Sequence, residues 1–382
     1  MRTILASLAA ALLVGQPAPA TLPPWTPGTL DIHQIVTARG NAAFIRYPDG
    51  TSLLVDAGDQ GTSDEMNGQP DRSRPAADAI TAYLQHALGV ERPHLDYALF
   101  THFHPDHVGA LSALLPHLQV DTIVDRGYDY LAPPANDEVF RTYRALIDGK
   151  VADRSSRHVA ARAGAREVIA AKKPIDAFEA RIISANDHVW TGEGDQTKQR
   201  FPALAGLAAE DRPTENMCSV TLRLTYGAFD FFAGGDQPGY PVPGAPAWHD
   251  LESDVARAIG ETDVHVVNHH GSIEEENPFW LRTLRSQVMI VPAWSPTHPS
   301  PDVLKRMLST RVYPDPRDIF ITLFRPPTQA TTGPRAKQVA SDRGHVVVRV
   351  EPGGAHFSVF VLDDQDPNLK VRLLKGPYTS GR

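Results

Sequence analysis

The feature that most constrains the fold is the stretch at residues 95–118, which reads LDYALFTHFHPDHVGALSALLPHL. It begins with an apolar run typical of a buried strand, and it ends with apolar residues at helical spacing. A strand that leads directly into a helix is the repeating unit of α/β proteins. The turn between the two is polar and carries His102, His104, Asp106 and His107. We therefore expect a strand at 95–102 and a helix at 108–118, joined by this turn.

The rest of the chain repeats these kinds of element. Residues 75–89 have helical spacing that stops at Gly89. Single strands are expected at 51–58, 120–127, 179–186, 263–271, 288–294 and 318–324. Two hairpins are expected at 219–236, turning at Tyr226-Gly227, and at 344–362, turning at Pro352-Gly353-Gly354. Because hairpins are mixed with strand–helix units, the pattern predicts a layered α/β protein with two mixed β-sheets.

Length and charge limit the domain count and the partners. A chain of 382 residues with 42% apolar residues can bury a large core, and no long linker divides residues 21–382, so we expect a single domain. The formal net charge of −8 argues against a stable complex with nucleic acid. Residues 139–173 look like a basic helical insert, with nine Lys and Arg against three acidic residues. This insert either attracts an anionic substrate or is a solvated helix face.

The first 20 residues have the pattern of a secretory signal peptide. One Arg precedes an apolar stretch from Ile4 to Val14, and Ala-Pro-Ala ends at Ala20. A membrane anchor is the alternative, but the stretch is shorter than the roughly 20 residues that a membrane span needs. The sequence thus predicts an exported protein, periplasmic or secreted, without a membrane anchor. Cys218 is the one cysteine and lies in an apolar run, so we expect it in the core and expect no intrachain disulfide.

The histidine-rich turn has the residue types of a metal site. His102 and His104 are two apart and could point the same way from an extended segment, while Asp106 and His107 follow where the turn leads into a helix. This spacing suits two adjacent metal ions. Imidazole and carboxylate ligands suit zinc, with manganese or iron as competitors. A turn that is histidine-rich by chance is the alternative.

The segment HFHPDH resembles the HxHxDH motif of the metallo-β-lactamase superfamily, and three further stretches match the motifs of that family in order. They are LLVDAGD, FDFFAGGD and VVNHHG. The resemblance implies a four-layer αββα sandwich with a site for two metals. It implies that Asp56 supports the site from behind and that Asp236 bridges the metals. Taken singly, each of these residues could also be an ordinary turn or loop residue.

The resemblance assigns the ligands and leaves one position open. It places His102 and His104 on the first metal and Asp106, His107 and His270 on the second. Relatives supply a third histidine to the first metal, and the strand that should carry it ends IISANDHVW. His188 is the candidate there, although it lies late in the motif, and Asn186 or Asp187 could occupy the position instead. His158, in the insert, is a weaker candidate.

The late motifs are similar to those of the exported hydrolase domain of bacterial DNA-uptake channel proteins, and phosphorylcholine esterases are a further relative. Both comparisons point to phosphate esters as substrates. The working hypothesis is an exported hydrolase with two divalent metals that activate a shared water. Its anionic substrate would be a small molecule or an oligomer. The candidate catalytic residues are Asp106, His269 and His298, although His298 could equally be a surface residue beside a helix. Two rival hypotheses are a lactonase or β-lactamase and a non-catalytic exported binding protein.

Overall fold

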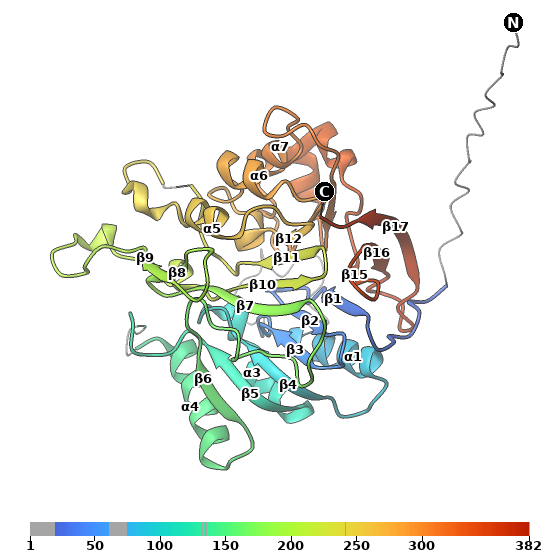
Figure 1. The fold of residues 1–382 in the computed structure, drawn as a ribbon, viewed down its shortest axis with the longest axis horizontal. Coiled ribbons are helices and arrows are strands. Elements are labelled where there is room, and N and C mark those ends of the chain that lie inside the picture. The colour runs from blue at the N-terminus through green and yellow to red at the C-terminus, as the bar shows by residue number, and fades with distance from the viewer. Residues whose placement is uncertain (1–19, 61–74, 132, 134–135, 241, 382) are drawn as a thin grey trace, which may run out of the picture.

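The structure is a computed structural model that describes residues 20–60, 75–131, 133, 136–240 and 242–381. Two β-sheets pack face to face, and helices cover the outer face of each sheet (Figure 1). The predicted class, an α/β sandwich of two mixed sheets, is confirmed. The signal-peptide prediction for residues 1–20 falls on residues that, apart from Ala20, lie outside the described part.

The first sheet has nine strands and is parallel in one half and antiparallel in the other. From β3 to β6 neighbouring strands are parallel, and the remaining pairs are antiparallel. Its order is β17 (Val371–Thr379), β16 (His356–Leu362), β15 (His345–Val350), β1 (Leu30–Gln34), β2 (Ala43–Arg46), β3 (Ser52–Val55), β4 (His94–Leu99), β5 (Gln119–Asp125) and β6 (Arg157–Ala160).

The second sheet has eight strands and is mixed in the same way. From β11 to β14 neighbouring strands are parallel, and the other half is built from antiparallel strands. Its order is β14 (Asp318–Ile321), β13 (Val288–Val291), β12 (Val264–Val266), β11 (Phe229–Ala233), β10 (Thr221–Tyr226), β7 (Phe178–Ala185), β8 (His188–Trp190) and β9 (Thr197–Gln199).

Three apolar clusters hold the layers together. The largest lies between the sheets and is made mostly of branched side chains from the facing strands. A second lies under the helices of the first sheet, and a third lies under those of the second sheet. The first set of helices is α1 (Ala76–Leu88), α2 (Pro105–Val108), α3 (Leu111–Leu114) and α4 (Glu138–Ala152). The second set is α5 (Leu251–Ile259), α6 (Pro278–Leu284), α7 (Pro301–Met307) and α8 (Pro326–Thr332).

Both predicted hairpins are present, as β10–β11 and β15–β16. The helix predicted at 108–118 is instead three short pieces, α2, α3 and a 3-10 turn at Leu115–His117. Pro116 explains the last break, because proline lacks the N–H that an α-helix needs in its interior. The strand predicted at 263–271 ends at Val266, where the backbone turns sharply.

The segment 139–173 is helical only as far as Ala152. After α4 it forms β6 and then an irregular connection of turns and bends in which Val168 and Ile169 pack into the core between the sheets. The prediction of a helical insert is therefore wrong beyond α4, because apolar residues that looked like a helix face pack against a sheet instead. Within the described residues, we find no helix with the length and apolarity that a membrane crossing requires.

Candidate metal centre

The histidine-rich turn begins just after β4, at the edge of the first sheet that is formed by the carboxyl ends of its parallel strands. The ring centroids of His102 and His104 are 4.8 Å apart, and His102 Nε2 lies 3.1 Å from His104 Nδ1. Pro105 opens α2, a position where its missing N–H costs nothing. Asp106 and His107 therefore fall in the first turn of α2. The turn thus presents one pair of ligand-type residues before the helix and one pair within it.

Asp56 follows β3 and lies behind this turn, fully buried. Its carboxylate accepts hydrogen bonds from the backbone N–H and the hydroxyl of Thr101 and from Nδ2 of Asn41. It also lies 2.6 Å from Nδ1 of His107. Because Nδ1 of His107 faces Asp56, Nε2 of that ring is left to face Asp236, at 3.1 Å. This is the arrangement expected of the supporting carboxylate that the sequence suggested.

Asp236 comes from the second sheet, just beyond the end of β11. The residue before it, Gly235, has a φ of 59°. A Cβ on Gly235 would lie 2.9 Å from the Cβ of Thr101, closer than real side chains approach. The two strand ends can therefore meet only because this position is a glycine.

His269 and His270 follow β12 in the 3-10 turn η5 (Asn268–Gly271), and both have left-handed backbones with φ of 43° and 56°. His270 is buried, and its Nδ1 lies 3.0 Å from the carbonyl oxygen of Pro292. Its Nε2 is then free to face Asp106, at 3.0 Å from Oδ2. The turn therefore directs His270 back toward the first sheet.

Two sets of ligand atoms meet between the sheet edges, and the ligand atoms of each set lie within 4.8 Å of one another. The larger set is Asp106, His107, Asp236 and His270, and the smaller set is His102, His104 and Asp236. His107 Nε2 is buried and makes no well-aligned hydrogen bond, although it points at Asp236. Imidazole and carboxylate donors with one shared carboxylate fit two adjacent divalent ions.

Burial and charge pull the pKa values of this cluster in opposite directions. Burial would lower the pKa of His107, but the carboxylates of Asp236 and Asp56 outweigh burial and raise it well above its usual value. Burial lowers the pKa of His102 well below its usual value. Burial would raise the pKa of Asp236, but His107 and its neighbours hold it well below the usual value. Protons and metal ions therefore compete for the same ligand atoms.

His269 and His298, the two predicted catalytic histidines, both lie beside the ligand sets. His269 is 29% exposed, and its Nδ1 lies 3.0 Å from Oε1 of the buried Glu275. Its Nε2 lies 3.7 Å from Asp236 Oδ2. Burial would lower the pKa of His269, but Asp236 and Glu275 raise it to about 9. His298 is buried and stacks on His270 with ring centroids 5.0 Å apart, so His269 is the more accessible of the two.

Two further candidates lie outside both ligand sets. The side chain of His188 is 49% exposed on β8, and its Nδ1 lies 2.8 Å from Oδ1 of Asp187. His158, on β6, lies 2.9 Å from the buried carboxylate of Asp125 under α4. The structure therefore does not bring either histidine to the smaller set, and a ligand role for His188 stays a prediction.

Asn186, the rival candidate, turns its amide away to Arg126. Its Nδ2 donates to the backbone oxygen of Arg126, and its Oδ1 accepts from Nη1 of the same residue at 3.3 Å. The buried guanidinium of Arg126 also binds Glu215 through two hydrogen bonds of 2.8 and 2.7 Å. This network holds the segment around Glu215 next to the histidine-rich turn, because Glu215 Oε1 accepts from the backbone N–H of Phe103 at 2.9 Å.

Three residues around the site did not emerge from the sequence. Asn41 contacts Asp56, and both Glu275 and Asn216 contact His269. Each lies in a polar loop close to a recognised motif. Polar residues in loops beside a ligand motif are the signal that could have pointed to them.

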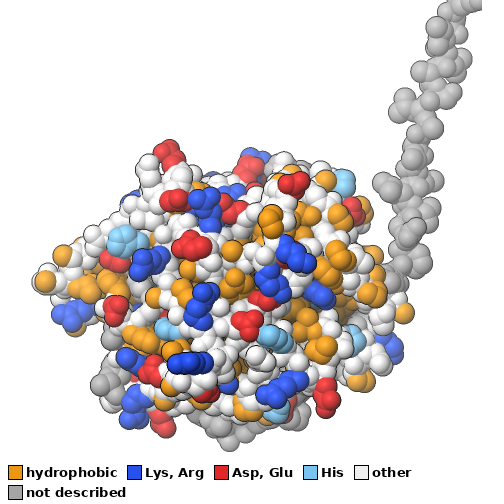
Figure 2. Space-filling view, turned by 60° about the horizontal axis from the view of Figure 1, so that its bottom comes forward, with side chains coloured by type: hydrophobic (Ala, Val, Ile, Leu, Met, Phe, Trp, Pro, Cys, Tyr) orange, Lys and Arg blue, Asp and Glu red, His pale blue; other side chains and the backbone are white. Residues whose placement is uncertain are grey.

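The basic residues of segment 139–173 are spread over the molecule. Lys172 pairs with Asp96 and Arg166 with Asp195, which occupies them in ion pairs. On the face shown in Figure 2, Lys and Arg side chains are interspersed with Asp and Glu. Within this segment, α4 packs beside α2, which carries two of the ligand residues.

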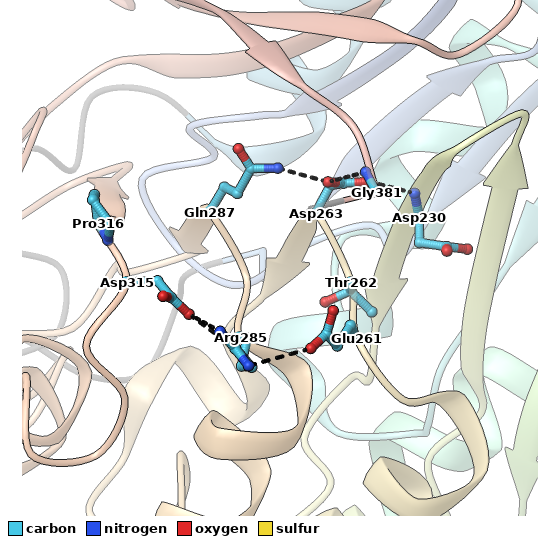
Figure 3. A pocket seen from close by; sticks show the side chains of 9 residues that line it. All are labelled: Asp230, Glu261, Thr262, Asp263, Arg285, Gln287, Asp315, Pro316 and Gly381. Carbon is cyan, nitrogen blue, oxygen red and sulfur yellow. Dashed lines mark hydrogen bonds and ion pairs between the residues drawn. The ribbon is translucent and has the colours of Figure 1, made fainter.

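A separate pocket of about 240 Å³ lies at the other end of the strands of the second sheet (Figure 3). Asp263, which immediately precedes β12, accepts hydrogen bonds there from Gln287 and from the backbone N–H of Gly381. Arg285 bridges Glu261 and Asp315. These carboxylates hold the C-terminal segment and neighbouring loops, and His269 and His270 follow the opposite end of β12.

Comparison with known proteins identifies a family. Residues 37–273 match the family model described as metallo-beta-lactamase superfamily. No curated protein matches the chain. A solved structure of a mutant of CmlA beta-hydroxylase is similar at 12% identity and a TM-score of 0.40, over 88% of this chain and 55% of that chain. This chain therefore spans about half the length of CmlA.

Two further solved structures are similar at low identity. Tm1679, a metal-dependent hydrolase of the beta-lactamase superfamily, is 12% identical with a TM-score of 0.39, over 76% of this chain and 95% of that chain. A metallo-beta-lactamase from Cronobacter sakazakii with a mutated HARLDQ motif is 12% identical with a TM-score of 0.30, over 59% and 70%. Identity and scores this low carry no inference about activity, so the assignment rests on the family model.

Proposed function

Because the chain belongs to the metallo-β-lactamase superfamily, we propose that it is an exported, metal-dependent hydrolase of phosphate esters. The observation that carries the hydrolytic part is the pair of ligand sets that share Asp236. Two divalent ions bound there, zinc before manganese or iron, would lower the pKa of a shared water toward about 7 and so supply a nucleophile at neutral pH.

The residues of the chain then have distinct tasks. Asp236 joins the two ligand sets, while His107 and His270 are held in place through their Nδ1 atoms by Asp56 and by a backbone carbonyl. His269 stands on the accessible side with Nε2 turned toward Asp236. In its protonated form it can donate a hydrogen bond from Nε2 to a substrate oxygen or to the leaving group. When Nε2 carries no proton, it can accept from the amide of Asn216, 3.4 Å away.

Two observations support a phosphate ester as the substrate. The late motifs are similar to those of DNA-uptake hydrolase domains. In addition, α4 packs beside α2 and exposes Arg141 and Arg144, which could meet an anionic group that extends from the site. Arginine binds phosphate through paired, charge-assisted hydrogen bonds.

Parallel assays test the reaction. The purified protein, stripped of metal and reloaded with zinc or manganese, should cleave bis(p-nitrophenyl) phosphate or p-nitrophenyl phosphate. The variant Asp236→Ala should be inactive with either metal, because it removes a ligand from both sets. Faster cleavage of a lactone or a β-lactam than of either phosphate ester would overturn the substrate class. Absence of metal binding by the wild-type protein would overturn the enzyme proposal itself.

Export rests on the N-terminal sequence and has its own test. Expression of the full chain in a Gram-negative host, followed by intact-mass measurement, should yield a mature protein that begins after Ala20. A cytoplasmic product that keeps its first 20 residues would contradict export without affecting the proposed chemistry.

A further inference from the structure

The smaller ligand set offers an ion fewer ligands than the larger one. Besides the shared Asp236, it contains only His102 and His104, whereas the larger set adds three residues of its own. Zinc sites in enzymes usually have three protein ligands and an open position. The smaller set reaches three ligands only by counting Asp236, which it shares, whereas the larger set has four. One further donor from the chain would give the two ions equal numbers of protein ligands.

The three positions that the motif IISANDHVW offered for the donor, Asn186, Asp187 and His188, are engaged elsewhere. Asp187 faces Nδ1 of His188 with one carboxylate oxygen and accepts from Gln199 with the other. Both polar atoms of the Asn186 amide are hydrogen-bonded to Arg126. His188 pairs with Asp187 and is half exposed on β8. None of the three side chains belongs to the smaller set as the chain is folded.

Asn216 directly follows a residue that contacts the histidine-rich turn. It opens the 3-10 turn Asn216–Cys218, directly after Glu215, whose carboxylate binds the backbone N–H of Phe103 between His102 and His104. Arg126 fixes that carboxylate, so the backbone at Asn216 cannot drift away from the histidine-rich turn without breaking three hydrogen bonds.

The amide of Asn216 also faces the opposite wall of the site. Its Nδ2 lies 3.4 Å from Nε2 of His269, which in turn lies 3.7 Å from Asp236 Oδ2. Its Oδ1 is buried and has no hydrogen-bond partner among the described residues. A buried acceptor without a partner destabilises the fold, so such an atom is expected to meet a ligand that the chain itself does not supply.

We propose that Oδ1 of Asn216 is a ligand of the metal ion bound by His102, His104 and Asp236. An amide oxygen is a neutral ligand for divalent metals. The inference rests on the proposed function in so far as both require metal at this centre. It predicts two unequal sites, a tighter one at the larger set and a weaker one completed by Asn216.

Metal titration of wild type and four variants tests this. Wild type, Asn216→Ala, Asn216→Asp, His188→Ala and the distant exposed control Asn368→Ala are stripped of metal and titrated with Zn²⁺, and bound metal is counted after dialysis. Loss of residues that merely orient ligands lowers metal affinity about 10- to 100-fold, so loss of a ligand atom should weaken one site at least tenfold. Asn216→Ala should keep one tight equivalent, and Asn368→Ala should match wild type with two.

Asn216→Asp distinguishes a ligand from a structural residue and also covers the case in which the alanine variant folds poorly. It keeps an oxygen at the same place and adds a charge, so it should retain two equivalents and bind the weaker one more tightly. With Co²⁺ in place of Zn²⁺, its visible absorption should differ from that of wild type, because a ligand atom has changed charge.

Three results would overturn the inference. They are two equivalents of unchanged affinity in Asn216→Ala, a loss in Asn216→Asp equal to that in Asn216→Ala, and a lost equivalent in His188→Ala instead. In each of these results wild type still binds two metals, so the proposed function would stand. Wild type that binds no metal would overturn both.

Discussion

Replacement of Asp56 by Asn probes how far the metal centre depends on the residues behind it. The change keeps the size of the side chain, and asparagine tolerates the left-handed backbone, with φ of 60°, at this position. One carboxylate oxygen accepts from the backbone N–H of Thr101, and the other faces Nδ2 of Asn41 at 2.9 Å and Nδ1 of His107 at 2.6 Å. An Asn side chain would place its NH₂ group against those two nitrogens.

The cost can be worked from these contacts. Two hydrogen bonds to a charged group are lost, each worth roughly 1.5–3 kcal/mol, which gives about 3–6 kcal/mol. His107 can relieve one contact by losing the proton on Nδ1 and keeping the one on Nε2, so about 1.5–3 kcal/mol of lost stability should remain. That tautomer has a proton on the nitrogen that faces Asp236, and metal affinity should fall about 10- to 100-fold.

Urea denaturation of the metal-free protein and competition titration with Zn²⁺ measure the two effects separately. The matched control is Asp125→Asn, which changes another fully buried carboxylate that accepts from Tyr143 and from the backbone of Gly127. The control should lose stability and keep wild-type metal affinity. If Asp56→Asn bound zinc as tightly as wild type, the idea that Asp56 sets the tautomer of His107 would be refuted.

Four further outcomes are expected. Asp236→Ala should lose both metal equivalents, as counted by elemental analysis, and a variant that retains two would contradict a shared ligand. Burial lowers the pKa of His33 to about 4, so below about pH 6.5 the native state binds fewer protons than the unfolded state. Between pH 7 and pH 5 wild type should therefore lose about 2 kcal/mol of its free energy of unfolding relative to His33→Gln, as measured by urea titration. Trp280→Ala should lower the free energy of unfolding by about 3–5 kcal/mol, because it leaves a cavity in the core. Trp280→Phe should lower it by less than about 1.5 kcal/mol, because the indole N–H has no partner among the described residues and its removal offsets part of the cavity; equal losses in the two variants would be inconsistent with this. Arg141→Ser with Arg144→Ser should raise KM for a phosphodiester at low ionic strength and have little effect at high ionic strength, and an unchanged KM at both would mean that α4 is only a solvated face.

The sequence predicts the layered fold because alternation of strands, helices and turns is a local property. The hairpins at Tyr226-Gly227 and Pro352-Gly353-Gly354 follow from turn residues alone. The error in segment 139–173 has the opposite origin. The burial of Val168 and Ile169 between the sheets is decided by distant strands, and local spacing resembles a helix face in either case.

The same distinction applies to the site. Ligand residues that are close in the sequence, such as His102 and His104, can be predicted from their spacing. The missing donor could not be found in this way, because the position of Asn216 depends on the contact between Glu215 and Phe103, which are far apart in the sequence. Likewise, the exposure of His188 follows from its place on β8, which pairs with the edge strand β9 of the second sheet.

The centre takes Asp106 and His107 from the edge of the first sheet and Asp236 and His270 from the second. An ion held by all four fastens one sheet to the other at the edge formed by the carboxyl ends of their parallel strands, and this set of donors exists only in the folded chain. Binding free energy is then added to the stability of the fold, by about 4 kcal/mol for an ion at a thousand times its Kd. How firmly the two sheets stay together therefore depends on the free metal concentration around the protein, and a chelator should part them first at this edge, while the apolar cluster between them stays packed.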